Sequence, residues 1–159
     1  MERKPIIIIG ADHAGFELKE KVKEKLRKKG YEVDDYGALE HDKDDDYPDY
    51  AKVVGEAVVK RKKPGILFCG SAEGMCIAAN KVKGARAIAA TDEKLVKKAK
   101  EHNDANILCL PGGGMKKKVK GIGIDPAKAM KLIDVFLKTK FSGEARHKRR
   151  LRKIAKIEK

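Results

Sequence analysis

The fold is decided by the stretch LFCGSAEGM at residues 67–75. The apolar residues that end at Cys69 predict a buried strand, and the small residues after them are typical of a tight turn into a helix, expected over 74–82. Such a turn gathers backbone N–H groups at the carboxyl end of a strand, where they favour an anion and lower the pKa of a neighbouring thiol. The stretch therefore predicts a proton acceptor beside an anion site. A core cysteine in a plain strand-to-helix turn explains the pattern equally well.

A second unit of the same kind comes first in the chain. Residues 6–9 predict a buried strand, GADHAG at 10–15 a turn, and the residues from Phe16 an amphipathic helix that ends near Gly30. Further strands are expected at 31–36, 65–69, 85–90 and 107–110, and further helices at 50–62, 93–101 and 126–138. Regular alternation of strands and helices predicts a Rossmann-like α/β protein whose parallel sheet is covered on both faces.

Ligands of such sheets bind outside the carboxyl ends of the strands, where the strand order switches. Asp12 and His13 follow the first strand, and Cys69 ends another. We expect these three residues and the residues just before Ile107 to gather at that edge.

The composition limits the class of protein. A chain of 159 residues suits one domain over 1–159, in which 143–159 form a basic C-terminal segment. The sequence has no apolar stretch that predicts a leader or a membrane span, and its three cysteines form neither a paired framework nor a metal-ligand pattern. We therefore expect a cytoplasmic protein without metal, cofactor or membrane partner. The net charge of +14 keeps a basic nucleic-acid-binding α/β module as an alternative, which the lack of Trp and the scarcity of aromatic residues disfavour.

Five motifs together resemble one family, the type B ribose-5-phosphate isomerases of the ribose and galactose isomerase group. They are GADHAGFELK at 10–19, DYPDYA at 46–51, the block at 69–81, EHNDAN at 101–106 and the segment at 143–150. The resemblance implies a three-layer sandwich with a five-stranded parallel sheet and a C-terminal basic helix. It also implies an aldose–ketose isomerase that interconverts ribose 5-phosphate and ribulose 5-phosphate through a cis-enediolate. A related isomerase for a six-carbon sugar phosphate, allose or galactose 6-phosphate, is the alternative.

The resemblance also implies catalytic roles. Cys69 would be the base, with Glu73 as its rival, and the amides of residues 70–74 would hold the enediolate oxygen. Ser71 would bind the same oxygen or assist ring opening, and His102 would be the acid or base at the ring oxygen, unless it only caps its helix. The protein would be a homodimer or tetramer whose sites are shared between subunits.

The remaining roles concern substrate binding. Asp12 and Asn103 would bind sugar hydroxyls, and Tyr47 would flank the substrate from a loop, by packing or by a hydrogen bond. The phosphate would be bound by His13 and by two arginines that share one face of a helix. The full set of expected substrate contacts is Asp12, His13, Tyr47, Gly70, Ser71, Ala72, Glu73, Gly74, Asn103, Arg146 and Arg150.

The chain departs from the family pattern in three places. One is Met75, which occupies the position where some members that lack the cysteine carry a glutamate base, so Cys69 remains the expected base. Ala72 and Glu73 interrupt a turn that usually reads Gly-Thr-Gly-x-Gly-Met, and the carboxylate would oppose an enediolate unless it points away. Gly113 stands where an arginine is usual, and an apparent insertion follows over 115–125. The insertion carries lysines that would bind the phosphate instead, or form a solvated basic loop: Lys116, Lys117, Lys118 and Lys120.

Overall fold

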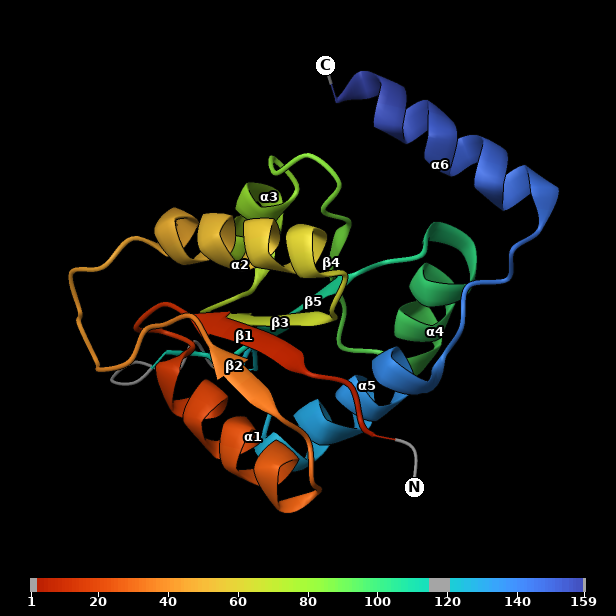
Figure 1. Cartoon of the computed structure of the whole chain (residues 1–159). Coiled ribbons are helices and arrows are strands. Elements are labelled where there is room, and N and C mark those ends of the chain that lie inside the picture. The colour runs from red at the N-terminus through yellow and green to blue at the C-terminus, as the bar shows by residue number, and fades with distance from the viewer. Residues whose placement is uncertain (1–2, 115–120, 159) are drawn as a thin grey trace.

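The computed structural model describes residues 3–114 and 121–158. Five strands, all paired in parallel, form one sheet in the order β2-β1-β3-β5-β4 (Figure 1). The strands are β1 (Ile7–Ala11), β2 (Val33–Asp35), β3 (Gly65–Cys69), β4 (Ala87–Ala89) and β5 (Ile107–Pro111). The predicted parallel sheet is confirmed, with β2 and β4 shorter than expected.

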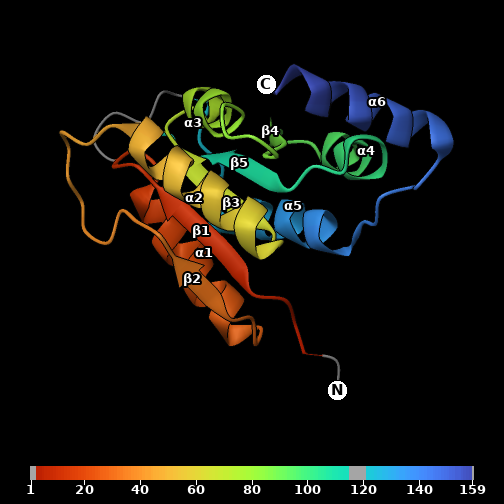
Figure 2. The ribbon, with the colours of Figure 1, turned by 45° about the horizontal axis from the view of Figure 1, so that its top comes forward.

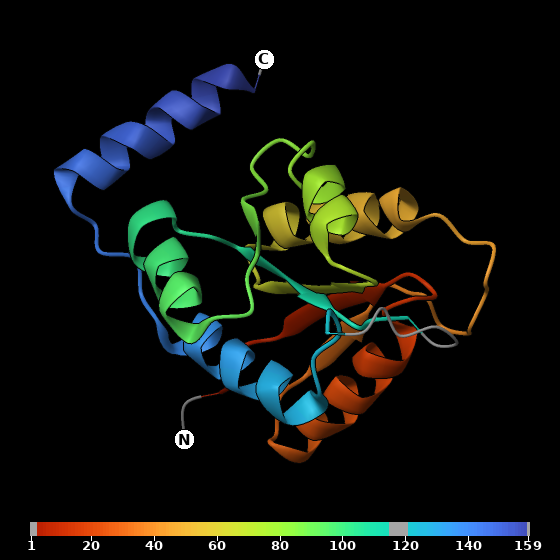
Figure 3. The ribbon, with the colours of Figure 1, turned by 180° about the vertical axis from the view of Figure 1, so that it is seen from behind.

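Helices cover both faces of the sheet, which gives the predicted three-layer sandwich. One face carries α1 (Phe16–Lys28), α4 (Glu93–Asn103) and α5 (Pro126–Lys138). The other face carries α2 (Tyr47–Arg61) and α3 (Glu73–Ala79), as Figures 1 and 3 show. No helix within the described ranges is long and apolar enough to cross a membrane.

Alternation along the strands divides the apolar core between these two faces. Ile9 and Phe68 belong to the cluster under α1, α4 and α5, whereas Ile8 and Cys69 belong to the cluster under α2 and α3. Because successive strand residues point to opposite faces, Cys69 lies on the same face as the helix that its own turn begins.

The predicted start of α2 and the predicted ends of α3 and α4 differ from the observed boundaries by two or three residues. Helix α2 begins at Tyr47 rather than 50, because Pro48 fits the first turn, where its missing N–H is not needed. Helix α3 ends at 79 rather than 82, since the Asn80 amide bonds both backbone groups of Ala87 at 2.8 Å. Helix α4 continues to Asn103 rather than 101 and ends where the next residue turns left-handed.

The last helix, α6 (Ala145–Ile157), projects from the sandwich beside α4 (Figures 1 and 2). All of its residues are described, and His147 alone among them is buried. At the far end of the helix, Glu158 accepts a hydrogen bond from the backbone of Gly84 at 3.0 Å. The predicted basic C-terminal helix is confirmed, and it is held to the body of the protein mainly at its two ends.

Candidate active site

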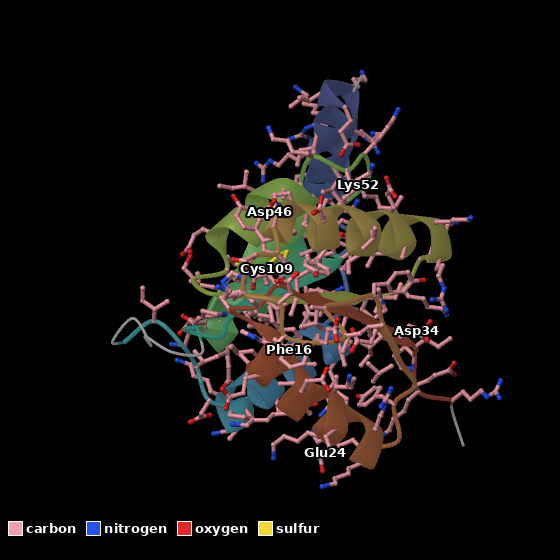
Figure 4. All side chains as sticks on the ribbon, turned by 90° about the vertical axis from the view of Figure 1, so that its left-hand side faces the viewer. Phe16, Glu24, Asp34, Asp46, Lys52 and Cys109 are labelled. Carbon is pink, nitrogen blue, oxygen red and sulfur yellow. The ribbon has the colours of Figure 1, made fainter. Side chains whose placement is uncertain are left out.

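The strand order switches between β1 and β3, so the carboxyl ends of these neighbouring strands form the crevice where parallel sheets bind ligands. Ala11 pairs with Phe68, which places Asp12 directly beside Cys69. The Cys69 thiol donates to Asp12 Oδ2 over 3.2 Å, and both side chains are buried. Figure 4 faces this edge, with Phe16 below the sheet and Asp46 above it. The predicted meeting of Asp12 and Cys69 is confirmed.

Gly15 allows the first turn to lie against the end of β3. A Cβ added at Gly15 would come within 2.2 Å of the backbone carbonyl carbon of Phe68 and 2.6 Å of the Cys69 nitrogen. Neither backbone atom can move far without breaking the sheet, so no larger residue fits. The Gly15 N–H also donates to Asp12 Oδ1 over 3.0 Å. The turn therefore fixes the Asp12 carboxylate against the thiol.

The electrostatics of Cys69 differ from the sequence prediction. Burial, and after it the negative charge and hydrogen bond of Asp12, raise the pKa of the Cys69 thiol to about 12. Backbone N–H groups of Gly70 and Ala72 bond the sulfur and lower the pKa, but their effect is smaller. The expected lowering of the thiol pKa is wrong, because a short turn of amides does not outweigh burial beside a carboxylate. In the free protein Cys69 is a thiol that donates to Asp12.

The loop after Cys69 places a left-handed residue at the start of α3. Ala72, where the family usually has glycine, adopts φ +79° and forms the N-cap of α3. The left-handed region costs an ordinary residue roughly 1–2 kcal/mol. Glu73 begins α3 and is exposed, as is Ser71. The Glu73 carboxylate therefore lies in solvent and not among the buried groups beside Cys69.

Tyr47 lies against this loop. It is the first residue of α2 and not part of a loop, so its expected placement is wrong. The ring packs on Gly74, where an added Cβ would come within 2.7 Å of Tyr47 Cζ. Of the two roles proposed for Tyr47, this contact supports packing.

A glycine-rich turn after β5 closes the crevice from the other side. The N–H of Gly112 donates to the Cys69 carbonyl over 2.7 Å, and that of Gly113 donates to the Gly70 carbonyl over 2.9 Å. Gly113 has φ +77°, and an added Cβ would lie 2.9 Å from Gly123 Cα. An arginine therefore does not fit at 113 in this backbone. The four lysines proposed as its substitutes, Lys116, Lys117, Lys118 and Lys120, lie outside the described residues, so that role stays a prediction.

His13 is held by a residue that the sequence did not indicate. Oδ1 of Asp45 accepts from the His13 backbone N–H over 3.1 Å and lies 2.6 Å from His13 Nδ1. The hydrogen bond to Asp45 is the largest cause that raises the His13 pKa above its usual value. Asp45 is one of three consecutive aspartates before Tyr47, and nothing in the sequence distinguishes it from its neighbours.

The carboxylates of Asp12 and Asp45 and the imidazole of His13 are close enough together to bind one cation. Ligand atoms of Asp12, His13 and Asp45 lie within 4.8 Å of one another. Asp12 already accepts from Cys69 and Gly15, and Asp45 already bonds His13. These hydrogen bonds account for the cluster, and we assign no metal ligand to it.

The residues before Ile107 do not join this edge. Helix α4 runs back across the sheet, so its last residues lie at the amino ends of the strands, where the Arg86 guanidinium bonds the Asn103 carbonyl over 3.1 Å. Cys69, by contrast, pairs with Pro111 at the carboxyl end of β5. The five residues of β5 alone separate the two edges by about 13 Å. The expectation that His102 and Asn103 gather with Cys69 within one chain is wrong.

His102 forms part of a second cluster, with α6. Its ring lies 4.4 Å from the ring of buried His147, whose Nδ1 is 2.6 Å from the Ser142 hydroxyl. Burial and the neighbouring His102 lower the His147 pKa. Arg146 and Arg150 are both exposed and, four residues apart, share one face of α6. His147 was not singled out from the sequence, because a lone histidine in a basic segment carries no distinguishing pattern.

Comparison with known proteins agrees with this geometry. Residues 7–154 match the Ribose/Galactose Isomerase family. The chain belongs to this family. It is 41% identical to the probable ribose-5-phosphate isomerase B of Mycoplasma genitalium, over 96% of this chain and 95% of that protein. The resemblance drawn from the motifs is confirmed.

Solved structures of family members share the fold. A ribose 5-phosphate isomerase from Thermotoga maritima has 44% identity and a TM-score of 0.85, covering 96% of this chain and 98% of that one. Ribose-5-phosphate isomerase B from Mycoplasma genitalium, solved with bound ribulose-5-phosphate, has 40% identity and a TM-score of 0.84, with 96% and 95% covered.

Proposed function

We propose that this family member interconverts ribose 5-phosphate and ribulose 5-phosphate. The observation that carries the proposal is the buried pair of Asp12 and Cys69 at the switch-point edge of the sheet, beside a loop of backbone amides. The relatives support the choice of substrate, since they are named ribose-5-phosphate isomerase B and one of them binds ribulose-5-phosphate.

Cys69 moves the proton between C2 and C1. Its thiolate takes the proton from C2, the electron pair of that C–H bond forms the C1–C2 double bond, and the aldehyde oxygen O1 becomes the enediolate oxygen. The O2 hydroxyl proton then passes to O1. Finally the thiol returns its proton to C1 while C2–O becomes the carbonyl. Amides of residues 70–74 stabilise the negative charge that develops on oxygen.

The thiol must first lose its own proton, because burial beside a carboxylate keeps Cys69 protonated in the free protein. Asp12 Oδ2, at 3.2 Å, is the acceptor in contact with it. The amides of Gly70 and Ala72 that face the sulfur then stabilise the thiolate. We assign Asp12 to this proton transfer and to orienting the thiol; its expected contact with a sugar hydroxyl stays a prediction.

The site is divided between two edges of one chain, so we infer that a second copy of the chain completes it. Cys69, Asp12 and His13 come from one subunit. His102 and Asn103, for the ring oxygen and a hydroxyl, would come from the other, together with the arginines of α6. This arrangement supports a homodimer or tetramer with shared sites, and it explains why α6 projects from its own sandwich (Figure 2).

Mixed subunits test the shared site. Cys69→Ala and His102→Asn proteins, each inactive alone, are unfolded together and refolded in equal amounts. If sites are shared in a dimer, half of the dimers are hybrids with one intact site each, and activity returns to about a quarter of wild type. If each chain carries a complete site, the mixture stays inactive.

Substrate choice is tested directly. The purified protein is given ribose 5-phosphate, allose 6-phosphate and galactose 6-phosphate, and ketose formation is followed. We expect the highest kcat/KM on ribose 5-phosphate. Preferred turnover of a six-carbon substrate would overturn the choice of substrate and keep the chemistry, whereas no turnover of any aldose phosphate would overturn both.

A further inference from the structure

Asp45 holds His13 at two points, and neither residue of this pair takes part in the proton transfer described above. One carboxylate oxygen, Oδ1, contacts both the backbone N–H and the ring Nδ1 of His13, at 3.1 and 2.6 Å. The Asp45 side chain is only 5% exposed, although it lies in the loop between β2 and α2. Its second oxygen, Oδ2, is buried with no hydrogen-bond partner among the described residues.

Burial of a carboxylate with one unpaired oxygen is unfavourable for stability. If Asp45 only held the loop in place, a neutral side chain could replace it without loss of stability. The charge of Asp45 therefore needs another explanation, and the group it touches provides one. His13 keeps 38% of its side chain exposed, and with Nδ1 bonded to Asp45 its Nε2 is the nitrogen left for a ligand.

The surroundings of His13 favour its charged form. Asp12 of its own turn and Asp42 and Asp45 of the facing loop raise the His13 pKa, against a lowering by burial. The His41 ring meets His13 edge-on, with ring centroids 6.2 Å apart. From α2, Tyr50 faces the same carboxylate, and burial, followed by the negative charge of Asp45, raises the pKa of the Tyr50 hydroxyl. Asp45 contributes the hydrogen bond, the largest of these effects.

We propose that Asp45 is a positioning residue, which holds the Nδ1 proton of His13 so that a charged Nε2–H is presented to the substrate phosphate. The inference rests on the proposed function, in which His13 binds that phosphate. A carboxylate on one imidazole nitrogen fixes the tautomer and the ring orientation and stabilises the imidazolium. Without Asp45, a phosphate dianion would face a ring that has lost the largest effect favouring its charge and that is more often neutral above the ordinary histidine pKa of about 6.5.

The test compares Asp45→Asn with Asp44→Asn in the full chain. Both changes remove one negative charge from the same loop, but the Asp44 side chain is 79% exposed. NMR titration of the imidazoles, with His13 assigned through a His13→Asn variant, reports the His13 pKa. Affinity for inorganic phosphate and KM for ribose 5-phosphate are measured from pH 6 to pH 8.5.

We expect the His13 pKa to fall in Asp45→Asn and to stay unchanged in Asp44→Asn. In Asp45→Asn at high pH, phosphate affinity should fall and KM rise about tenfold, as for loss of one charge-assisted hydrogen bond. Both should return toward wild type at low pH, with kcat changed less than twofold. A merely structural role would raise KM equally at every pH.

An unchanged His13 pKa in Asp45→Asn overturns the proposal, as does a lowered pKa without loss of phosphate affinity. Should Asp45→Asn fail to fold, His13→Asn decides. The ratio of wild-type to His13→Asn phosphate affinity, in which the ionisation of phosphate itself cancels, should fall as the pH rises, and a constant ratio overturns the proposal. A wild-type protein that binds phosphate through His13 but does not convert ribose 5-phosphate contradicts the proposed function and leaves the role of Asp45 intact.

Discussion

The two edges of the sheet carry two kinds of functional group. At the carboxyl edge, Asp12 and Cys69 are buried and held by turns that pack on backbone atoms. At the amino edge, His102 and the α6 arginines lie on helix surfaces, and only His147 behind them is buried. The first edge is organised by one chain alone. The second presents side chains outward, so its function depends on what lies against it.

The largest effect is expected at the carboxyl edge, where we propose that the proton is moved. Cys69→Ala removes the proposed base and should lower kcat by at least about 10²-fold. Alanine is smaller than cysteine and uncharged, so it fits beside buried Asp12 and the fold should be kept. The circular dichroism spectrum should therefore match that of the wild type. Glu73→Gln serves as the comparison and should keep most of its activity, since Glu73 is exposed. The reverse result would transfer the role of base to Glu73.

The next effect sharpens the role of the outward-facing edge. Arg146→Ala/Arg150→Ala removes two guanidinium groups from one face of α6, and KM for ribose 5-phosphate should rise at least tenfold, at about 1.5 kcal/mol or more for each charge-assisted bond. The double change Lys148→Ala/Arg152→Ala removes the same charge at the same spacing from another face of the helix. Steady-state kinetics should show little change for this control. Equal increases in both would mean that net charge matters and that the face of the helix does not.

A smaller effect concerns how α6 is held. The His147 pKa is lowered in the folded protein, so the unfolded segment binds a proton more readily. Stability of the α6 contact is therefore complete above the ordinary histidine pKa of about 6.5 and is lost as pH falls below it. Hydrogen exchange of α6 amides, corrected for intrinsic rates, should show less protection at pH 5 than at pH 7.5.

Two controls accompany this measurement. Protection within β3 should not change over the same pH range, because its core residues Ile66, Leu67 and Phe68 are fully buried and none of them titrates. His147→Gln should abolish the pH dependence at α6. If that variant keeps the same dependence, His147 is not the group responsible.

The smallest effect is a gain in stability at the carboxyl edge. Ala72→Gly relieves a left-handed alanine, but it also makes the unfolded chain more flexible, so the free energy of unfolding should rise by no more than about 1 kcal/mol. Ala78→Gly, inside α3, should lower it by roughly 0.5–1 kcal/mol. Denaturant titration compares the two. A loss of stability in Ala72→Gly would show that the loop does not carry this strain.

Local patterns predicted the elements and the first half of the site. Unbroken apolar runs, such as residues 6–9 and 65–69, indicate buried strands, and the small residues after each run indicate a turn. Parallel strands bring the residues after them to one edge, so the meeting of Asp12 with Cys69 follows from the order of elements alone. The sequence by itself thus determined the sheet, its helices and the contact between Asp12 and Cys69, the pair to which we assign the chemistry.

Tertiary structure decided what depends on distance and burial. The direction of α4 decides at which edge of the sheet His102 lies. A sequence motif does not show in which direction its helix runs. The Cys69 pKa depends on how far burial beside Asp12 outweighs two amides. Asp45 is distinguished from its neighbouring aspartates only by its contact with His13, 32 residues away along the chain. Electrostatic and packing energies act between groups close in space, and only the folded chain defines which groups those are.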